Sequence, residues 1–258
     1  MNEQADALSA WRHNQDQPWN RLRYRLVEAN LQRCIGDGVA WRVLDVGGGD
    51  GRDALPLAQR GHTVHLLDRD AAMLAEAERC AAELGVANRI RTQLTDVDAN
   101  ALPVTSDSYD LVLCHNLLQY LPDPAPLLRG MAQALRPGGW LSLLSPNPVA
   151  ETLRLALQQH DLAAAHASLT ATTHRNHFYG VEMHLRDLAA WRSLLAAAGF
   201  EGIEYTGVRC VNDYIDDDAV KFSEAGFVQL LALETALGPR SPYRDIARLW
   251  QITARRPA

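Results

Sequence analysis

The chain has 258 residues, of which 47% are hydrophobic, so it is long and apolar enough to bury the core of one large α/β domain. Its formal net charge of −6 weighs against a strongly electrostatic nucleic-acid binder. No run approaches the ~20 apolar residues of a membrane helix, the N-terminus lacks the apolar stretch of a signal peptide, and the scattered cysteines show no metal-ligand spacing. We therefore expect a cytoplasmic protein with no membrane contact and no bound metal.

Two acids and a glycine-rich turn mark the first part of the chain. Residues 1–20 are predicted to be a mobile lead-in, and residues 21–36 an amphipathic helix. Residues 42–46 are predicted to form a buried strand, and the glycines after it allow a sharp turn and a close approach to a ligand. Asp68 comes 23 residues after Asp45, at the end of a second apolar run. A carboxylate at this strand tip typically holds the ribose hydroxyls of a nucleoside.

The glycine pattern indicates the type of nucleoside. The dinucleotide fingerprint G-x-G-x-x-G fails because its third glycine would fall on Arg52, and the phosphate loop fails because no lysine follows the glycines. The pattern D-x-G-x-G-x-G, from Asp45 to Gly51, suits a cofactor that has a positive centre and no phosphates. It indicates S-adenosylmethionine, whose ammonium group Asp45 would help to hold. The alternative is an ordinary strand-to-helix turn.

Later segments are predicted to continue the sheet. Thr95 and Asp96 follow a third short strand, where a polar side chain can reach the adenine amine. Residues 108–116 form a predicted fourth strand that carries His115 near its end, and residues 135–143 a helix end, a tight turn and a fifth strand. Ligands of open α/β sheets bind beyond the carboxyl ends of the strands, so these polar residues are expected to gather there.

Several motifs carry a family resemblance across residues 41–145. They read LDVGGGDG, LLDRDAAML, TDV, YDLVLCHNLLQYLPDP and LRPGGWLSL, in this order. The chain resembles the class I S-adenosylmethionine-dependent methyltransferases. The resemblance implies a Rossmann-like α/β fold: a seven-stranded sheet, parallel except for one late strand, with helices on both faces and a lid insertion after strand five. It also implies S-adenosylmethionine as the methyl donor and S-adenosylhomocysteine as the product of a direct displacement.

The whole chain, 1–258, is predicted to form a single methyltransferase domain. Residues 41–145 are the cofactor-binding core, 146–190 a lid that shapes substrate choice, and 191–258 the C-terminal half of the sheet. Within the lid, residues 151–169 are predicted to be one helix. After the lid we expect a helix at 185–198, a strand at 201–205, a loop at 207–214, a helix at 222–236 and a last strand at 249–254.

The resemblance is closest to one branch and extends beyond the cofactor half. The helix with Arg23 and the segments TGVRCVNDY, LLALETALG, PYRDIARLW and ITARRP match the bacterial family that methylates the carboxyl of carboxymethoxyuridine at the tRNA wobble position. Arg23 is predicted to reach the cofactor carboxylate; the alternative is a solvated surface arginine. The resemblance implies cofactor contacts by Arg23, Gly47, Gly48, Asp68, Leu94, Thr95 and His115. The predicted cofactor site also includes Asp45, Gly49, Arg69 and Asp96. The predicted substrate side comprises Arg175, Arg209, Asp213, Tyr214 and Tyr243.

Methyl transfer from a sulfonium needs orientation and water exclusion more than acid–base chemistry. A base is needed only when the acceptor keeps a proton at neutral pH, and His115 is then the catalytic candidate, with His174 and His177 as alternatives. His115 has two other interpretations, a cofactor contact through its ring or a packing role without proton transfer. Residues 115–118 read HNLL and not the [DNS]-P-P-[YFW] of many N-methyltransferases, so an oxygen acceptor is favoured.

Functions from three classes stay open at this point. The first is methylation of a carboxylate or hydroxyl oxygen of modified tRNA. The second is methylation of a small molecule, a natural product or a metabolite; the lid has no lysine, and loss of cationic contacts weakens phosphate binding. The third is a non-catalytic cofactor-binding partner, because family membership does not by itself demonstrate activity. The expected assembly is a monomer or a homodimer.

Overall fold

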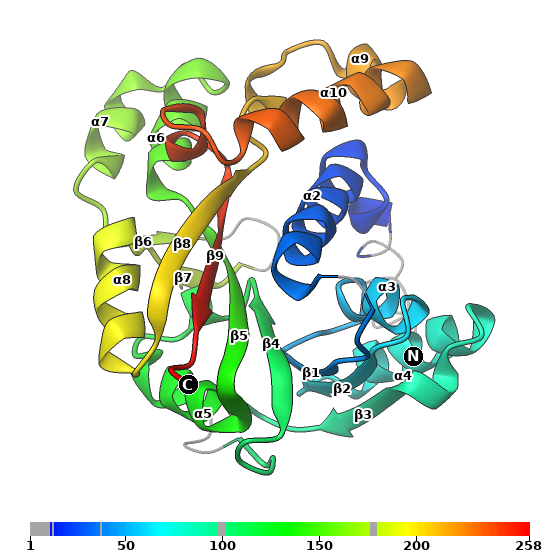
Figure 1. Ribbon diagram of the computed structural model, residues 1–258. Helices are drawn as coiled ribbons and strands as arrows, with labels where there is room; N and C mark the ends of the chain where they lie inside the picture. Colours follow the sequence, from blue (N-terminus) through cyan, green and yellow to red (C-terminus); the bar gives the residue numbers. More distant parts are fainter. Residues whose placement is uncertain (1–10, 12, 37, 98–101, 176–179) are drawn as a thin grey trace.

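A seven-stranded mixed sheet forms the centre of the molecule (Figure 1). The computed structural model describes residues 11, 13–36, 38–97, 102–175 and 180–258. The strand order is β3-β2-β1-β4-β5-β9-β8; β9 runs antiparallel to both neighbours, and the pairs among β1 to β5 are parallel. The strands are β1 (Arg42–Val46), β2 (Thr63–Asp68), β3 (Ile90–Leu94), β4 (Tyr109–His115), β5 (Leu135–Pro146), β8 (Glu201–Val208) and β9 (Leu249–Arg255). This arrangement confirms the predicted Rossmann-like fold with one late antiparallel strand.

Helices cover both faces of this sheet, because successive residues of each strand point to opposite sides. Val64 and Leu66 of β2 belong to one buried cluster and Leu67 to the other. The first cluster includes residues of α2 (Pro18–Ile35), α3 (Ala54–Gln59), α4 (Ala71–Glu83) and α10 (Glu224–Leu237), and the second residues of α5 (Ala125–Ala134) and α8 (Leu188–Ala197). Among the described residues, no helix combines the length and apolar character needed to cross a membrane.

The strand register brings the predicted polar residues to one edge of the sheet. Val46 lies beside Leu67 in the β1–β2 pair, so Asp45 and Asp68 both lie at the carboxyl ends of their strands. His115 is the last residue of β4 and pairs with Leu144 of β5. The strand register therefore places these side chains together at the carboxyl ends of the strands, as predicted.

Within the described residues, the segment predicted as a lid after β5 contains two helices and a hairpin. In Figure 1, α6 (Pro148–Leu157) and α7 (Leu162–Ser168) lie at the upper left, and β6 (Thr173–Arg175) pairs antiparallel with β7 (Glu182–His184). The prediction of one helix over residues 151–169 is wrong. The backbone of His160 has φ 54°, in the left-handed region that often follows a helix end. Asp161 then accepts a hydrogen bond from the N–H of Ala164 and begins the next helix.

Other predicted boundaries also differ from the structure. The helix predicted over residues 222–236 corresponds to α10, which begins two residues later because Ser223 is extended and its hydroxyl accepts from the N–H of Gly226; a short helix, α9 (Asp218–Phe222), precedes it. β8 continues to Val208, into the predicted loop. Regular structure begins before the end of the predicted 1–20 lead-in, since α2 starts at Pro18, whose fixed φ suits a first helical turn.

Candidate functional site

The glycine turn after β1 is held against β2 and has an open surface. The N–H groups of Gly47 and Gly48 both donate to the carbonyl of Leu67, at 2.8 and 3.1 Å. A Cβ on Gly48 would come within 2.5 Å of Asp45 Oδ2, so the carboxyl of Asp45 packs directly under the turn. A Cβ on Gly49 would meet no atom within 4 Å. The turn therefore needs glycine on its inner side and leaves free space on its outer side.

Asp68 ties the glycine turn to the tip of β2. Its Oδ2 accepts from the N–H of Gly49 at 2.8 Å, and its Oδ1 accepts from the N–H of Asp70 at 2.9 Å. Its backbone carbonyl accepts from the N–H of Thr95 at 2.7 Å, just after β3. Each carboxylate oxygen of Asp68 keeps a further lone pair. The side chain is thus fixed and still able to accept from a diol.

Asp45 is a buried carboxyl with an unsatisfied oxygen. Its side chain lies under the turn with the residue 1% exposed, and Oδ2 has no hydrogen-bond partner within the described residues. Burial, and then the nearby carboxylates of Asp53 and Asp68, raise the pKa of Asp45 well above its usual value. A buried polar atom without a partner is uncommon in folded proteins and points to a missing ligand contact. A cationic group beside Asp45 would offset the energetic cost of burying its carboxylate.

Asp53 is the residue that sequence reasoning missed. It lies just before α3; its Oδ1 accepts from Nη1 of Arg23 on α2 at 2.9 Å, and its Oδ2 lies 2.8 Å from Nη2 of the same arginine. Its Oδ2 also lies 3.1 Å from Nδ1 of His115. Burial opposes ionisation of Asp53, but Arg23 and His115 together lower its pKa below the usual value. The available signal was an acid two residues after Gly51, which could pair with Arg23.

The remaining predicted cofactor residues line the tips of β2 and β3. Leu94 is the last residue of β3 and is 60% exposed. Thr95 is half-buried, and Arg69 and Asp96 are exposed. An exposed leucine beside the Asp68 carboxylate is an apolar surface on which a flat base can lie. The predicted cofactor residues thus lie along the carboxyl ends of β1, β2, β3 and β4, with Arg23 entering from α2.

The predicted substrate residues are less closely grouped. Arg209 has a left-handed backbone with φ 64° and makes a two-contact salt bridge with Asp213, including a 2.8 Å bond from Nε. The hydroxyl of Tyr214 donates to the carbonyl of Ile246 at 2.7 Å. Arg175 on β6 and Tyr243 are both exposed, and in the described part of the chain they share no hydrogen bond with Arg209 or Tyr214.

Glu151 links the lid to the end of the sheet, and sequence reasoning missed this contact as well. It accepts from Arg154 at 2.6 and 3.0 Å, and from Arg248, just before β9, at 3.1 Å. His174 of the hairpin lies 3.7 Å from the same carboxylate. The other alternative base, His177, lies outside the described residues. The lid is therefore held by charge pairs at its base.

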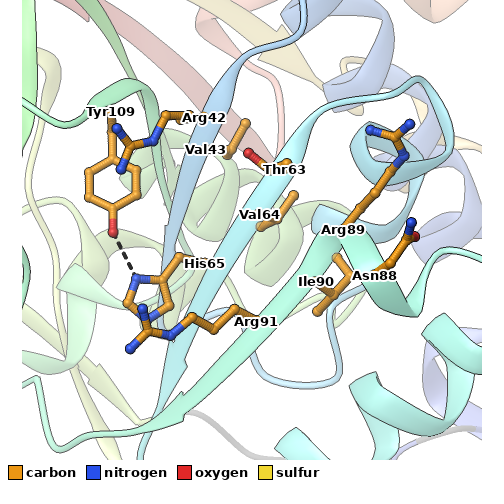
Figure 2. A pocket seen from close by; sticks show the side chains of 10 residues that line it. All are labelled: Arg42, Val43, Thr63, Val64, His65, Asn88, Arg89, Ile90, Arg91 and Tyr109. Carbon is orange, nitrogen blue, oxygen red and sulfur yellow. Dashed lines mark hydrogen bonds between the residues drawn. The ribbon is translucent and has the colours of Figure 1, made fainter.

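A hollow lies at the opposite end of the sheet from the candidate site (Figure 2). Its lining includes Arg42, Thr63, Ile90 and Tyr109, the first residues of β1 to β4, and it encloses about 230 Å³. Inside it, Nδ1 of His65 lies 2.7 Å from the hydroxyl of Tyr109. Ligands of parallel sheets bind at the carboxyl ends of the strands, so this hollow is separate from the candidate site.

Comparisons with known proteins decide the family. A model described as a methyltransferase domain matches residues 43–139. The chain is 32% identical over 249 residues to the tRNA 5-carboxymethoxyuridine methyltransferase of Escherichia coli K12, and the match covers 92% of this chain and 89% of that protein. The chain belongs to the S-adenosylmethionine-dependent methyltransferases of class I. It is also 34% identical to the ubiquinone biosynthesis O-methyltransferase of Leptothrix cholodnii, over 50% of this methyltransferase and 53% of that one.

Solved structures agree on the fold of this methyltransferase. An S-adenosylmethionine-dependent methyltransferase from Mesorhizobium loti superposes with a TM-score of 0.61 at 24% identity, covering 89% of this chain and 98% of that one. A methyltransferase described as putative, from Listeria monocytogenes, gives a TM-score of 0.61 at 17% identity, covering 91% and 98%. Both comparisons support the Rossmann-like architecture.

The candidate site fits the family's methyl donor. The unsatisfied oxygen of Asp45 suits its ammonium group, the free donors of Arg23 suit its carboxylate, and Asp68 suits its ribose diol. The open space over Gly49 leaves room for the nucleoside. Within the described residues, no cluster of His, Cys, Asp and Glu side chains has the geometry of a metal site.

The open space over Gly49 gives a first prediction. In the variant G49A, a methyl group would fill this space and the S-adenosylhomocysteine affinity, measured by calorimetry, is expected to fall about tenfold or more. G61A is the matched control, because Gly61 also has positive φ, at 97°, and also meets nothing within 4 Å. Both variants lose roughly 1–2 kcal/mol of stability from backbone strain. Equal affinity in the two variants would contradict the assignment of the turn.

The Glu151 network gives a second prediction. Burial alone would raise the pKa of Glu151, but hydrogen bonds from Arg154 and Arg248 lower it to about 2. Its contribution to stability is therefore complete above the ordinary glutamate pKa and is lost as the pH falls toward 2. E151Q should reduce the free energy of unfolding by about 1–3 kcal/mol at pH 7, and the difference from wild type should shrink below pH ~4.5.

Denaturant unfolding at several pH values measures this effect. E83Q is the control, since Glu83 pairs with Arg79 on the surface with its side chain 63% exposed, and it should change stability by less than about 1 kcal/mol. If the difference in unfolding free energy between E151Q and wild type stays constant from pH 7 to pH 3, the two arginines do not lower the pKa of Glu151.

Proposed function

We propose that this methyltransferase transfers a methyl group from S-adenosylmethionine to an oxygen acceptor, the carboxylate of 5-carboxymethoxyuridine in tRNA. The observation that carries the proposal is the extent of the similarity. The match to the E. coli tRNA 5-carboxymethoxyuridine methyltransferase covers 92% of this chain, so it extends well beyond the cofactor half. The match to the ubiquinone biosynthesis O-methyltransferase of L. cholodnii covers half of it. The parts outside the cofactor half, where the acceptor would bind, thus resemble the tRNA enzyme.

The proposed cofactor pose assigns one chemical group to each part of the site. Arg23 holds the donor's carboxylate, Asp45 attracts its ammonium group, and Asp68 accepts from its ribose hydroxyls. Gly47, Gly48 and Gly49 pass beneath the nucleoside, and His115 lies beside the reacting end. Arg69, Leu94, Thr95 and Asp96 surround the adenine. A nucleoside in this position presents its methyl group toward the lid.

The acceptor site in this proposal lies between the lid and the Arg209–Tyr214 segment. Packing of α6 against this segment, with Gln158 donating to the carbonyl of Asp213, supports this location. Arg209, Arg175, Tyr214 and Tyr243 are the proposed contacts to the acceptor's carboxylate and to neighbouring phosphates. A carboxylate acceptor needs no general base, so the protein's work is orientation and exclusion of water.

The test uses tRNA from a strain that lacks this gene. The purified protein should transfer a radioactive methyl group to this tRNA, and mass spectrometry of the digested nucleosides should show the methyl ester of the carboxymethoxyuridine. D68A, which loses the proposed ribose contact, should lower the transfer rate at low donor concentration by about 10- to 100-fold. Unlabelled tRNA, with S-adenosylhomocysteine still bound by the protein, would refute the acceptor and leave the cofactor assignment intact.

A small-molecule acceptor is the second candidate. The lid contains no lysine, and the ubiquinone biosynthesis O-methyltransferase of L. cholodnii matches half of this chain. Turnover of a small carboxylate or phenol without turnover of tRNA would support it. Binding of the donor without turnover of any acceptor class would instead favour a non-catalytic partner protein. We propose a protein of the cytoplasm that acts as a monomer or a homodimer.

A further inference from the structure

A line of buried polar side chains runs from α2 through the core to His115. Asn30 Nδ2 donates to Gln251 Oε1 at 2.8 Å, and Gln251 Nε2 lies 3.1 Å from Ser142 Oγ. Ser142 Oγ in turn lies 3.0 Å from Nε2 of His115. Gln251 is 1% exposed and Ser142 is fully buried. Methyl transfer as described above uses none of Asn30, Gln251 and Ser142, so this polar line needs a separate explanation.

The donor and acceptor of each hydrogen bond in this line can be assigned from its α2 end, where Arg33 contacts Asn30. Arg33 can only donate, and it donates to Oδ1 of Asn30. The amide nitrogen of Asn30 must then face Gln251, whose oxygen accepts, so the amide nitrogen of Gln251 faces Ser142. The hydroxyl oxygen of Ser142 therefore accepts from Gln251, and its proton points elsewhere.

The proton of Ser142 determines the protonation state of His115. A buried hydroxyl proton without an acceptor is costly, and Nε2 of His115 is the acceptor within reach in the described structure. Nε2 must then carry a lone pair, which leaves the ring proton on Nδ1. Nδ1 faces Oδ2 of Asp53 at 3.1 Å, and that carboxylate can only accept. The N–H does not point directly at this oxygen, so the contact is mainly electrostatic.

We propose that Ser142 and Gln251 are positioning residues that hold His115 as the neutral tautomer with its proton on Nδ1. In this state Nε2 is occupied by the Ser142 hydroxyl, and Nδ1–H faces the carboxylate that also binds Arg23. His115 therefore orients Asp53 and Arg23 for the donor and takes no proton from the acceptor. The role of His115 in orienting Asp53 and Arg23 for the donor rests on the proposed function. The tautomer assignment does not.

Nitrogen-15 NMR of histidine-labelled protein without cofactor tests the tautomer directly. The His115 signals are assigned by their loss in H115N. The wild type should show a protonated Nδ1 and an unprotonated Nε2 at neutral pH. A proton on Nε2, or on both nitrogens, would overturn the proposal, and this readout is made on the wild type.

Two serine variants separate positioning from general packing. S142A removes the hydroxyl donor and should release His115 into a mixture of tautomers. S145A is the matched control, because Ser145 lies on the same strand and is also buried, but its hydroxyl accepts from Trp191 at 3.0 Å. S145A should leave the His115 signals unchanged. An unchanged His115 tautomer in folded S142A would refute the positioning role of Ser142.

Replacement of His115 separates positioning from proton transfer. In H115N the amide nitrogen takes the place of Nδ1–H, so the affinity for S-adenosylhomocysteine should stay within about threefold of wild type, while H115F should lose about tenfold. The rate of methyl transfer by H115N should fall by no more than its affinity for the donor falls. Loss of transfer with unchanged S-adenosylhomocysteine affinity would identify His115 as a base. If the wild type shows the predicted tautomer but binds no S-adenosylhomocysteine, the proposed function fails and the tautomer assignment stands.

Discussion

The carboxylate of Asp68 is the contact on which the cofactor side depends. It accepts from the N–H of Gly49 in the glycine turn and from the N–H of Asp70 at the start of α4. One side chain thereby fixes the loop after β1 against the loop after β2. A charged acceptor makes stronger hydrogen bonds to backbone N–H groups than a neutral one. Without this contact the turn would be held against β2 only by the hydrogen bonds from the N–H groups of Gly47 and Gly48 to the carbonyl of Leu67.

Several buried charged side chains lie in opposite-charge pairs. Arg23 and Asp53 neutralise each other, and Glu151 is neutralised by Arg154 and Arg248. Asp45 differs from these pairs, because its Oδ2 is buried without a hydrogen-bond partner in the described structure. Burying an unpaired polar atom costs stability, and such costs are commonly retained at functional sites. In the proposed pose, the ammonium group of the donor lies beside this atom.

Local patterns in the sequence predicted the parts of the fold that depend on neighbours along the chain. The buried strand 42–46, the glycine turn and the acid at position 68 were predicted because hydrophobic runs and glycine act locally. The break at His160 was missed, since a histidine with left-handed backbone carries no strong sequence signal. The Ser142–Gln251 contact joins residues 109 positions apart, and Asp53 gains its role from Arg23 on a different helix. Such pairs depend on tertiary structure, and composition and periodicity do not contain them.

The central claim is that a nucleoside with a cationic centre binds across the glycine turn, with its diol on Asp68. Calorimetric titration of the intact, folded protein with S-adenosylhomocysteine tests this claim most directly. The account predicts saturable binding of one molecule per chain, which D68A weakens while remaining folded. Absence of binding to the wild type, or equal affinity in D68A, would contradict it.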